Sequence, residues 1–347
     1  MKPRVGGVSV NRRNFLHYLS WVPAANLAIP RLSGMEPSEK SPIGRSESNA
    51  QYSSDRQFRV GIVGLVGAGV YYLDRVAQSL KYPCKQIAVE TDIARLRWCH
   101  AEHTLLIGDH GSKPATIRDA QLMTRDRKSD ISQLVIGLDL AFILTGLNGT
   151  AGKGVTSVVA EALAESGIFT IAITPGHRDV EVTKSLQRLV DVGFEVPYDV
   201  LMNEARSSRR STWRELVSAA IAQICRVITF SLAKSGPAGI DAEELRSVLK
   251  GDSASVVGYG NGDGVEGCLA AFDAASTSPL LGADRMKLSR GLMVSIEARP
   301  GILKDSDIHL VMDKTREIAW DRAKLRFRAY NDAHLDSDYR VTILSRG

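Results

Sequence analysis

The sequence predicts an α/β protein with a doubly wound parallel sheet, followed by a long helix and a smaller α+β domain. Two observations indicate the sheet: short apolar runs alternate with segments of helical periodicity from Phe58 onward, and glycine-rich turns follow several of these runs. The third observation is that helical segments precede strand-like runs in the second half of the chain. The first part is therefore expected to be Rossmann-like, with ligands bound at the carboxyl ends of its strands, where the glycine turns fall.

The elements of the first part are expected in a regular order. The expected strands are residues 58–67, 85–91, 103–109, 140–146 and 168–174. The expected helices between them are residues 70–80, 93–101 and 157–167. The run LAFILTG at 140–146 is apolar throughout, which is typical of a strand buried on both faces of a parallel sheet.

The second part begins with a long helix, expected at 210–236 and ended by Gly236 and Pro237. Short helices are expected at 241–250 and 267–277, and strands at 291–298, 307–312 and 339–345. We therefore expect an N-terminal extension (1–56), an α/β domain that includes the central helix (57–235) and a C-terminal α+β domain (236–347).

Composition and charge argue against two classes of function. Of the 347 residues, 24% are charged and 44% apolar, and no run approaches the ~18 consecutive apolar residues of a membrane-spanning helix. The formal net charge is +5, but residues 1–57 hold eight Lys or Arg and four acidic residues, so most of the excess lies there. A near-neutral body without a basic stripe does not predict a nucleic-acid partner.

The cysteines and histidines predict no metal site. Cys84, Cys99, Cys225 and Cys268 form no CxxC pair, and the seven histidines have no HExxH spacing. Reduced thiols in a cytoplasmic protein are the expected state.

The N-terminal extension is rich in Ser, Pro, Gly and Asn, and most of it is expected to be disordered. Its NRRNFL segment resembles a twin-arginine export signal. The alternative is an amphipathic arm that binds a partner or tethers the protein to a membrane. Cytoplasmic location is the favoured expectation, because the resemblance described below implies a nucleotide that is found in the cytoplasm.

The segment GLNGTAGKGVTS, beginning at Gly146, is a candidate phosphate-binding loop. A Walker loop requires GxxxxGK followed by Ser or Thr, but residue 147 is Leu and residue 154 is Gly. The loop of an ATP-dependent ligase fits GTAGK and then meets Gly154 and Val155, so the match is partial.

A third alternative fits a longer span. NGTAGKGVTSVVAE resembles the GGGTGTG loop of FtsZ, the bacterial tubulin homologue, with departures at Asn148, Thr150, Ala151 and Lys153. VGIVGLVGAGVYYLDRV is similar to the first nucleotide loop of that family, with Tyr71 in place of an asparagine. VETDIARL is similar to its NTDxxxL turn, with Glu90 in place of an asparagine.

Downstream segments extend the resemblance to the C-terminus. IGDHGSKPA stands where a loop that touches the terminal phosphate belongs, and GIDAEELRSVL resembles the loop that completes hydrolysis on the neighbouring subunit. ASTSPLL and SRGLMVSIEA resemble ISSPLL and ARGVLVNITA. The resemblance implies the tubulin/FtsZ fold, GTP or GDP accompanied by Mg²⁺, and head-to-tail filaments of this chain, or of this chain with another FtsZ.

The resemblance also implies a set of site residues. Asp241 and Glu244 match the catalytic carboxylates, although Gly239 replaces a nearby asparagine; the alternative is that Asp241 and Glu243 only cap a helix. Lys153 either neutralises phosphate charge or points to solvent, and Trp213 either contacts the base or packs in the core. The implied nucleotide-binding residues are Gly64, Gly67, Ala68, Gly69, Thr91, Asp92, Gly111, Asn148, Gly149, Thr150, Ala151, Gly152, Lys153, Gly154, Asn203, Trp213 and Ser218.

These features lead to two main hypotheses of function. The first is an FtsZ-like GTPase that forms filaments and hydrolyses GTP across the subunit interface, in a process such as cell division. The second is a degraded member of the family that serves as a scaffold or regulator without hydrolysis. A third hypothesis, an ATP-dependent ligase, is supported by the GTAGK segment alone. Nucleic acid is not expected as a partner, and membrane contact is expected only indirectly or through the N-terminal arm.

Overall fold

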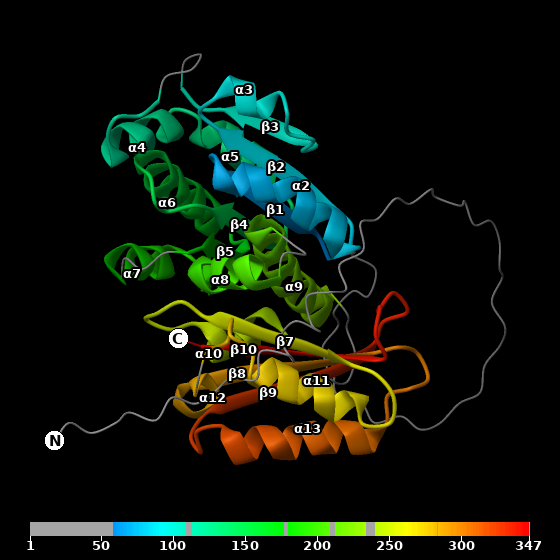
Figure 1. Cartoon of the computed structure of the whole chain (residues 1–347). Helices are drawn as coiled ribbons and strands as arrows, with labels where there is room; N and C mark the ends of the chain where they lie inside the picture. Colours follow the sequence, from blue (N-terminus) through cyan, green and yellow to red (C-terminus); the bar gives the residue numbers. More distant parts are fainter. Residues whose placement is uncertain are drawn as a thin grey trace, which may run out of the picture.

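The computed structural model describes residues 58–108, 113–176, 180–208, 212–233, 240–282 and 284–346. The N-terminal extension, with its NRRNFL segment, and the predicted site residue Gly111 lie outside this part of the chain. Within it, the expected α/β architecture is confirmed, and a second, smaller sheet follows the first (Figure 1).

The first sheet has six parallel strands in the order β3-β2-β1-β4-β5-β6. In register, Val63 of β1 is paired with Ile87 of β2 and Ile143 of β4. The order of a doubly wound nucleotide-binding sheet is thus present, with β1 and β4 at its centre. Its strands are β1 (Val60–Leu65), β2 (Cys84–Glu90), β3 (His103–Leu106), β4 (Leu140–Thr145), β5 (Phe169–Pro175) and β6 (Val192–Val196).

Helices cover both faces of this sheet, which is why its central strands are apolar throughout. On one face, Ile62 and Phe142 pack in a single buried cluster with α2 (Ala68–Leu80) and α9 (Trp213–Ala233). On the other face, Val63 and Ile143 pack with α5 (Lys128–Val135), α6 (Thr150–Glu165) and α7 (Val180–Leu189). The remaining helices of this part are α3 (Ile93–Leu96), α4 (Ile117–Arg125) and α8 (Tyr198–Ser208).

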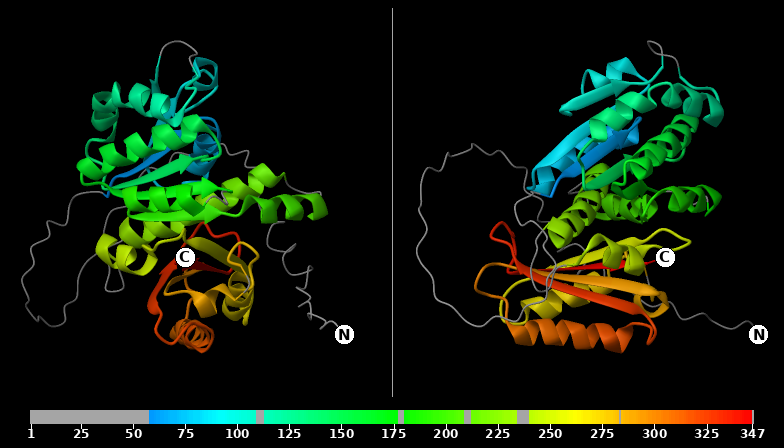
Figure 2. Two further views of the ribbon diagram at one scale, coloured as in Figure 1. Left: turned by 90° about the vertical axis from the view of Figure 1, so that its left-hand side faces the viewer. Right: turned by 180° about the vertical axis from the view of Figure 1, so that it is seen from behind.

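The second sheet has four strands in the order β7-β10-β8-β9, and α9 lies between it and the first sheet (Figures 1 and 2). β10 is antiparallel to β7 and β8, whereas β8 and β9 are parallel. The elements of this part are α10 (Ala242–Leu249), β7 (Val256–Gly262), α11 (Gly267–Ser276), α12 (Arg285–Leu288), β8 (Gly291–Ala298), α13 (Asp305–Ile318), β9 (Lys324–Asn331) and β10 (Tyr339–Ser345).

The backbone links the two sheets directly. Ser255, just before β7, donates its N–H to the Gly193 carbonyl over 2.8 Å and accepts the N–H of Glu195 over 2.9 Å. These bonds join β6 to the segment that enters the second sheet.

Several expected elements are corrected by the structure. Residues 307–312 were expected as a strand but belong to helix α13, because Val311 and Thr315 are buried at helical spacing and the Asp307 carboxylate accepts the Lys304 N–H over 3.2 Å. Helix α6 begins at Thr150, seven residues before the expected start at residue 157, with Gly149 as its N-cap residue. Strands β6, β7 and β9 and helices α4, α5, α7, α8 and α12 were not expected.

One helix among the described residues, α9, is long and apolar enough to cross a membrane by length and composition. However, 72% of its most apolar window is buried inside the protein. That burial is the property of a core helix.

Candidate functional site

Two glycine turns meet at the carboxyl edge of the first sheet, one after β1 and one after β4. Gly69 lies so close to β4 that an added Cβ would be 2.0 Å from the Leu144 carbonyl oxygen. A Cβ on Gly146 would be 3.1 Å from the Cβ of Ala68. The two predicted loops are therefore brought together, and Gly69 is needed for the contact between them.

Two further glycines of the predicted loop have structural roles in α6. A Cβ on Gly152 would lie 1.9 Å from the Gly146 carbonyl oxygen, and one on Gly154 would lie 2.5 Å from the Cβ of Ala120 in α4. Gly152 allows the first turn of α6 to pack closely against the Gly146 carbonyl, and Gly154 allows α4 to pack closely on α6. A phosphate is not required to explain either residue.

The exposed positions of this loop are Asn148, Gly149 and Thr150, while Ala151 is half-buried. A Cβ on Gly149 would have no neighbour within 4 Å. Because Gly149 is the N-cap residue of α6, the unpaired N–H groups of the first helical turn lie next to open space. This is the arrangement that binds an anion at a helix N-terminus.

A cavity of about 610 Å³ adjoins the first turn and lies between α2, α3 and α9. The predicted residues Gly67, Ala68 and Trp213 line it, which places Trp213 on the same side as the glycine turns. Its other lining residues are Val70, Tyr71, Tyr72, Asp74, Arg75, Arg95, Trp98, Cys99 and Arg214.

The walls of the cavity combine aromatic rings with guanidinium groups. Arg75 lies 4.3 Å from the centre of the Tyr71 ring, and Arg214 lies 4.6 Å from the centre of the Trp213 ring. The Trp213 ring also packs on Tyr198 of α8, with ring centres 5.8 Å apart. Flat rings can stack on a base and guanidinium groups can bind phosphate, so the cavity suits an anionic aromatic ligand.

Burial sets the protonation state of two side chains at this cavity. It raises the pKa of Tyr72 to about 12, and the neighbouring Tyr71 adds to the effect. Burial also raises the pKa of the Cys99 thiol. At neutral pH both groups are therefore protonated, and neither carries a negative charge that would repel a phosphate.

The turn after β2 contacts the glycine turn after β1 through the buried side chain of Glu90. Its Oε2 accepts the Gly67 N–H over 2.7 Å and its Oε1 accepts the Thr91 N–H over 2.9 Å. The predicted residues Thr91 and Asp92 follow directly; Thr91 is buried, and Asp92 caps α3 by accepting the Ala94 N–H over 2.9 Å. Gly67 is among the predicted nucleotide-binding residues, but its N–H is already bonded to the Glu90 carboxylate.

Of the predicted nucleotide-binding residues, Gly67, Ala68 and Trp213 line this cavity. Lys153, Asn203 and Ser218 lie neither in it nor at the turn after β2. Lys153 lines a separate cavity of about 260 Å³ between α4, α6 and α7. Asn203 was expected in a loop but lies within helix α8. Ser218 is buried in α9, where its hydroxyl donates to the Arg214 carbonyl over 2.8 Å.

The predicted catalytic pair starts helix α10. The Asp241 carboxylate accepts the Glu244 N–H over 2.7 Å, and Glu244 returns the contact to the Asp241 N–H over 3.4 Å. This capping box is the structural role that the sequence left open for Asp241. Asp241 is exposed and the Glu244 side chain is 40% exposed, so both carboxylates also face outward.

Helix α10 lies at the amino edge of the first sheet, opposite the glycine turns. Arg246 of α10 binds Asp191, immediately before β6, with Nε 2.9 Å from Oδ1. Its guanidinium also lies 5.2 Å from the ring centre of Phe169, the first residue of β5. Within one copy, the carboxylate pair and the glycine turns are therefore at opposite edges of the sheet.

Sequence reasoning missed most of the cavity's polar lining, namely Asp74, Arg75, Arg95 and Arg214. One signal was available, because Tyr71 and Arg75 are four residues apart on α2 and must share a face. The others come from different elements, and no local pattern relates them. Among the described residues, no three His, Cys, Asp or Glu side chains gather as a group that could hold a metal ion.

Comparison with known proteins identifies similar sequences and similar structures. No protein-family model matches the chain. Cell division protein FtsZ of Neisseria gonorrhoeae is 26% identical over 310 residues, which cover 83% of this chain and 78% of that protein. Cell division protein FtsZ 1 of Thermococcus kodakarensis is 27% identical over 315 residues, covering 84% of this chain and 83% of that protein.

Solved structures show the same fold. The empty FtsZ dimer of M. jannaschii has a TM-score of 0.70 and 20% identity, covering 85% of this chain and 89% of that chain. CetZ2 from Haloferax volcanii, solved as a GTPγS-bound protofilament, has a TM-score of 0.60 and 15% identity, covering 84% of this chain and 93% of that chain.

Proposed function

Because the chain is a divergent FtsZ-like member of the tubulin superfamily, we propose that it is a cytoskeletal GTPase that assembles head to tail. In this proposal, guanine nucleotide binds where the two glycine turns meet, with its base toward Trp213 and Tyr71. Asp241 and Glu244 of one copy complete the site of the next copy.

The observation that carries the proposal is the separation of the two half-sites. Helix α9 begins at Trp213 beside the cavity and has 21 residues, so it is about 30 Å long. The carboxylate pair follows its far end, at the opposite edge of the sheet. A site made of both halves requires a second copy, and a repeated contact between different surfaces produces a filament when its rotation does not close into a ring.

The chemistry proposed for each half follows from its geometry. The N–H groups at the start of α6 and the guanidinium groups of the cavity hold the phosphates, with Mg²⁺ accompanying the nucleotide. The incoming carboxylates orient and polarise water beside the terminal phosphate. Asp241 and Glu244 are outward-facing, as this role requires.

The test is phosphate release from GTP as a function of protein concentration. We expect the native chain to gain activity per molecule above a critical concentration. The double variant Asp241→Asn with Glu244→Gln should lose at least about 100-fold in turnover while its GTP affinity stays within about threefold, since it alters the half that does not hold nucleotide. Glu243→Gln, on the same helical turn, is the matched control and should retain turnover. Absence of guanine-nucleotide binding to the native chain would refute the proposal.

A second candidate is a family member that assembles as a scaffold or regulator without hydrolysis. The observation that favours it is Glu90, whose carboxylate takes the Gly67 N–H beside the proposed phosphate site. This candidate predicts assembly, seen by light scattering, with no phosphate release at any protein concentration.

The cellular process is a separate step of the proposal. Several relatives are named cell division proteins, so we propose division as the process. A fluorescent fusion that forms a ring at the division site would support it, and diffuse fluorescence throughout the cell cycle would contradict it.

A further inference from the structure

We propose that Glu90 is a specificity-determining residue that limits how much phosphate charge the site accepts. The inference rests on the proposed function and concerns the same site. The carboxylate of Glu90 takes the position of an anion at the start of α2, so the protein carries part of the negative charge that a ligand would otherwise bring.

The contacts of Glu90 are those of a bound anion. Oε2 accepts the N–H of Gly67, the N-cap residue of α2, over 2.7 Å, and Oε1 accepts the N–H of Thr91 over 2.9 Å. The side chain is 0% exposed. Main-chain N–H groups at a helix start are the same donors that hold phosphate oxygens elsewhere. Glu90 therefore satisfies these donors without a ligand.

The charge of Glu90 is only partly balanced by its neighbours. Among the described residues, its one ion pair is with Arg95, whose Nη1 lies 3.6 Å away and whose side chain is 53% exposed. Arg95 also faces Asp92, with Nε 3.9 Å from Oδ2, and lines the cavity. A single exposed cation shared by two carboxylates leaves net negative charge beside Gly67.

A ligand in the cavity thus meets two opposing fields. Arg75, Arg95 and Arg214 attract phosphate from the walls. Asp74 in the same lining and Glu90 at the glycine turn repel it. Removing one negative charge about 6 Å from a phosphate strengthens binding by roughly 10- to 100-fold at the effective dielectric constant of a protein surface. The increase in affinity caused by removing the Glu90 charge should rise with the number of phosphates on the ligand. It should vanish for a ligand that has no phosphate.

The experiment is calorimetric titration with guanosine, GMP, GDP, GTP and inorganic pyrophosphate. The variant Glu90→Gln removes the charge and keeps the shape of the side chain. Glu90→Asn is a second neutral variant, in case the Gln amide disturbs the turn. The matched control is Glu317→Gln, which neutralises an exposed carboxylate on α13 that pairs with Lys314. Circular dichroism and thermal unfolding show whether each variant is folded.

The inference predicts that Glu90→Gln binds GTP and pyrophosphate at least about tenfold more tightly than the native chain, guanosine within about twofold, and GMP in between. Equal changes for guanosine and GTP, or unchanged or weaker pyrophosphate binding in both Glu90 variants, would overturn it. If no guanine compound binds any of the proteins, the proposed function fails. A gain in pyrophosphate binding on removal of the Glu90 charge would then still support the inference, and no gain would overturn it.

Discussion

At the residue scale, the glycines of the two turns differ in what they do. Gly69 and Gly152 lie against main-chain carbonyl oxygens, so a side chain there would collide with the backbone. Gly149 has an ordinary extended backbone, with φ of −119° and open space where a Cβ would be. A glycine-rich motif therefore combines positions that the fold requires with a position that a ligand can use.

A matched pair of substitutions separates these roles. Gly69→Ala should lower the free energy of unfolding by about 1–3 kcal/mol or more, because the backbone at Leu144 must move away. Gly149→Ala should change it by less than about 1 kcal/mol and should weaken nucleotide binding, because its Cβ would occupy the space beside the α6 N–H groups. Urea unfolding and calorimetric titration measure the two effects. Equal destabilisation by both substitutions would contradict the assignment.

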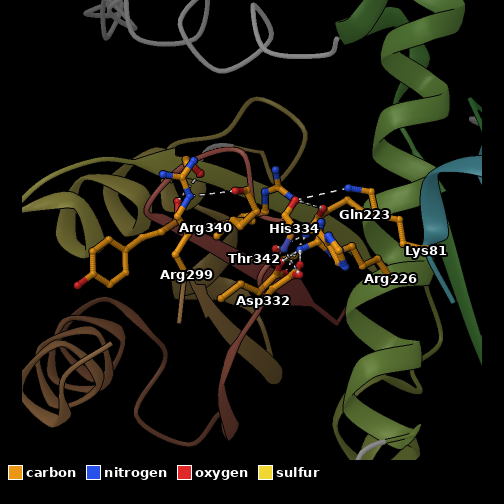
Figure 3. A network of polar contacts seen from close by, with 12 residues as sticks. Lys81, Gln223, Arg226, Arg299, Asp332, His334, Arg340 and Thr342 are labelled. Atoms are coloured by element: carbon orange, nitrogen blue, oxygen red, sulfur yellow. Dashed lines mark hydrogen bonds and ion pairs between the residues drawn. The ribbon is translucent and has the colours of Figure 1, made fainter. Parts of the chain in front are cut away.

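At the element scale, a buried polar network joins helix α9 to the second sheet (Figure 3). Arg226 of α9 donates to Glu297 of β8 and, over 2.5 Å, to Asp332 after β9. Gln223, one turn earlier, donates to Thr342 of β10 over 2.8 Å. Helix α9, which begins beside the cavity, is thus fixed to the second sheet, whose strands come after Asp241 and Glu244 in the sequence. The proposed domain boundary after residue 235 falls in 234–239, outside the described residues.

Breaking this network should be costly because its groups are buried. Arg226→Met would leave Glu297, whose side chain is 0% exposed, without its cation, and we expect a loss of about 3–5 kcal/mol in the free energy of unfolding. Arg316→Ala removes an exposed ion pair with Asp313 and should cost less than about 1 kcal/mol. Urea denaturation of both variants checks the difference. A small loss for Arg226→Met would mean that the network does not fix the helix.

At the scale of the whole molecule, one copy presents two incomplete sites at opposite edges of its first sheet. The aromatic and cationic cavity is at one edge, and Asp241 and Glu244 are at the other. Neither half can reach the other within the chain, because the length of α9 separates them.

Mixing two defective variants tests whether two copies together form one complete site. Trp213→Ala should weaken nucleotide binding, and Asp241→Asn with Glu244→Gln should remove the catalytic carboxylates, so each protein alone should release little phosphate. A mixture should regain activity, because an interface between intact halves of the two variants forms in mixed filaments. Activity that stays at the sum of the separate proteins would argue against a shared site.

Patterns along the chain were enough to predict the alternation of strands and helices, the long central helix and the two glycine turns. These depend on local properties: continuous apolar runs, helical spacing and residues without a side chain. For the same reason, the short apolar run at 307–312 was misassigned, because in so few residues a strand and one face of a helix look alike.

The arrangement of the site residues, in contrast, depends on how the elements pack in three dimensions. Arg75, Arg95 and Arg214 line one cavity, whereas Lys153 lines another. Glu90 accepts the N–H of Gly67, which is 23 residues away in sequence. Such groups come together through the packing of α2, α3 and α9 on the sheet, which no pattern along the chain encodes. The separation of the two half-sites is a property of the same packing, because it follows from which edge of the sheet each loop reaches.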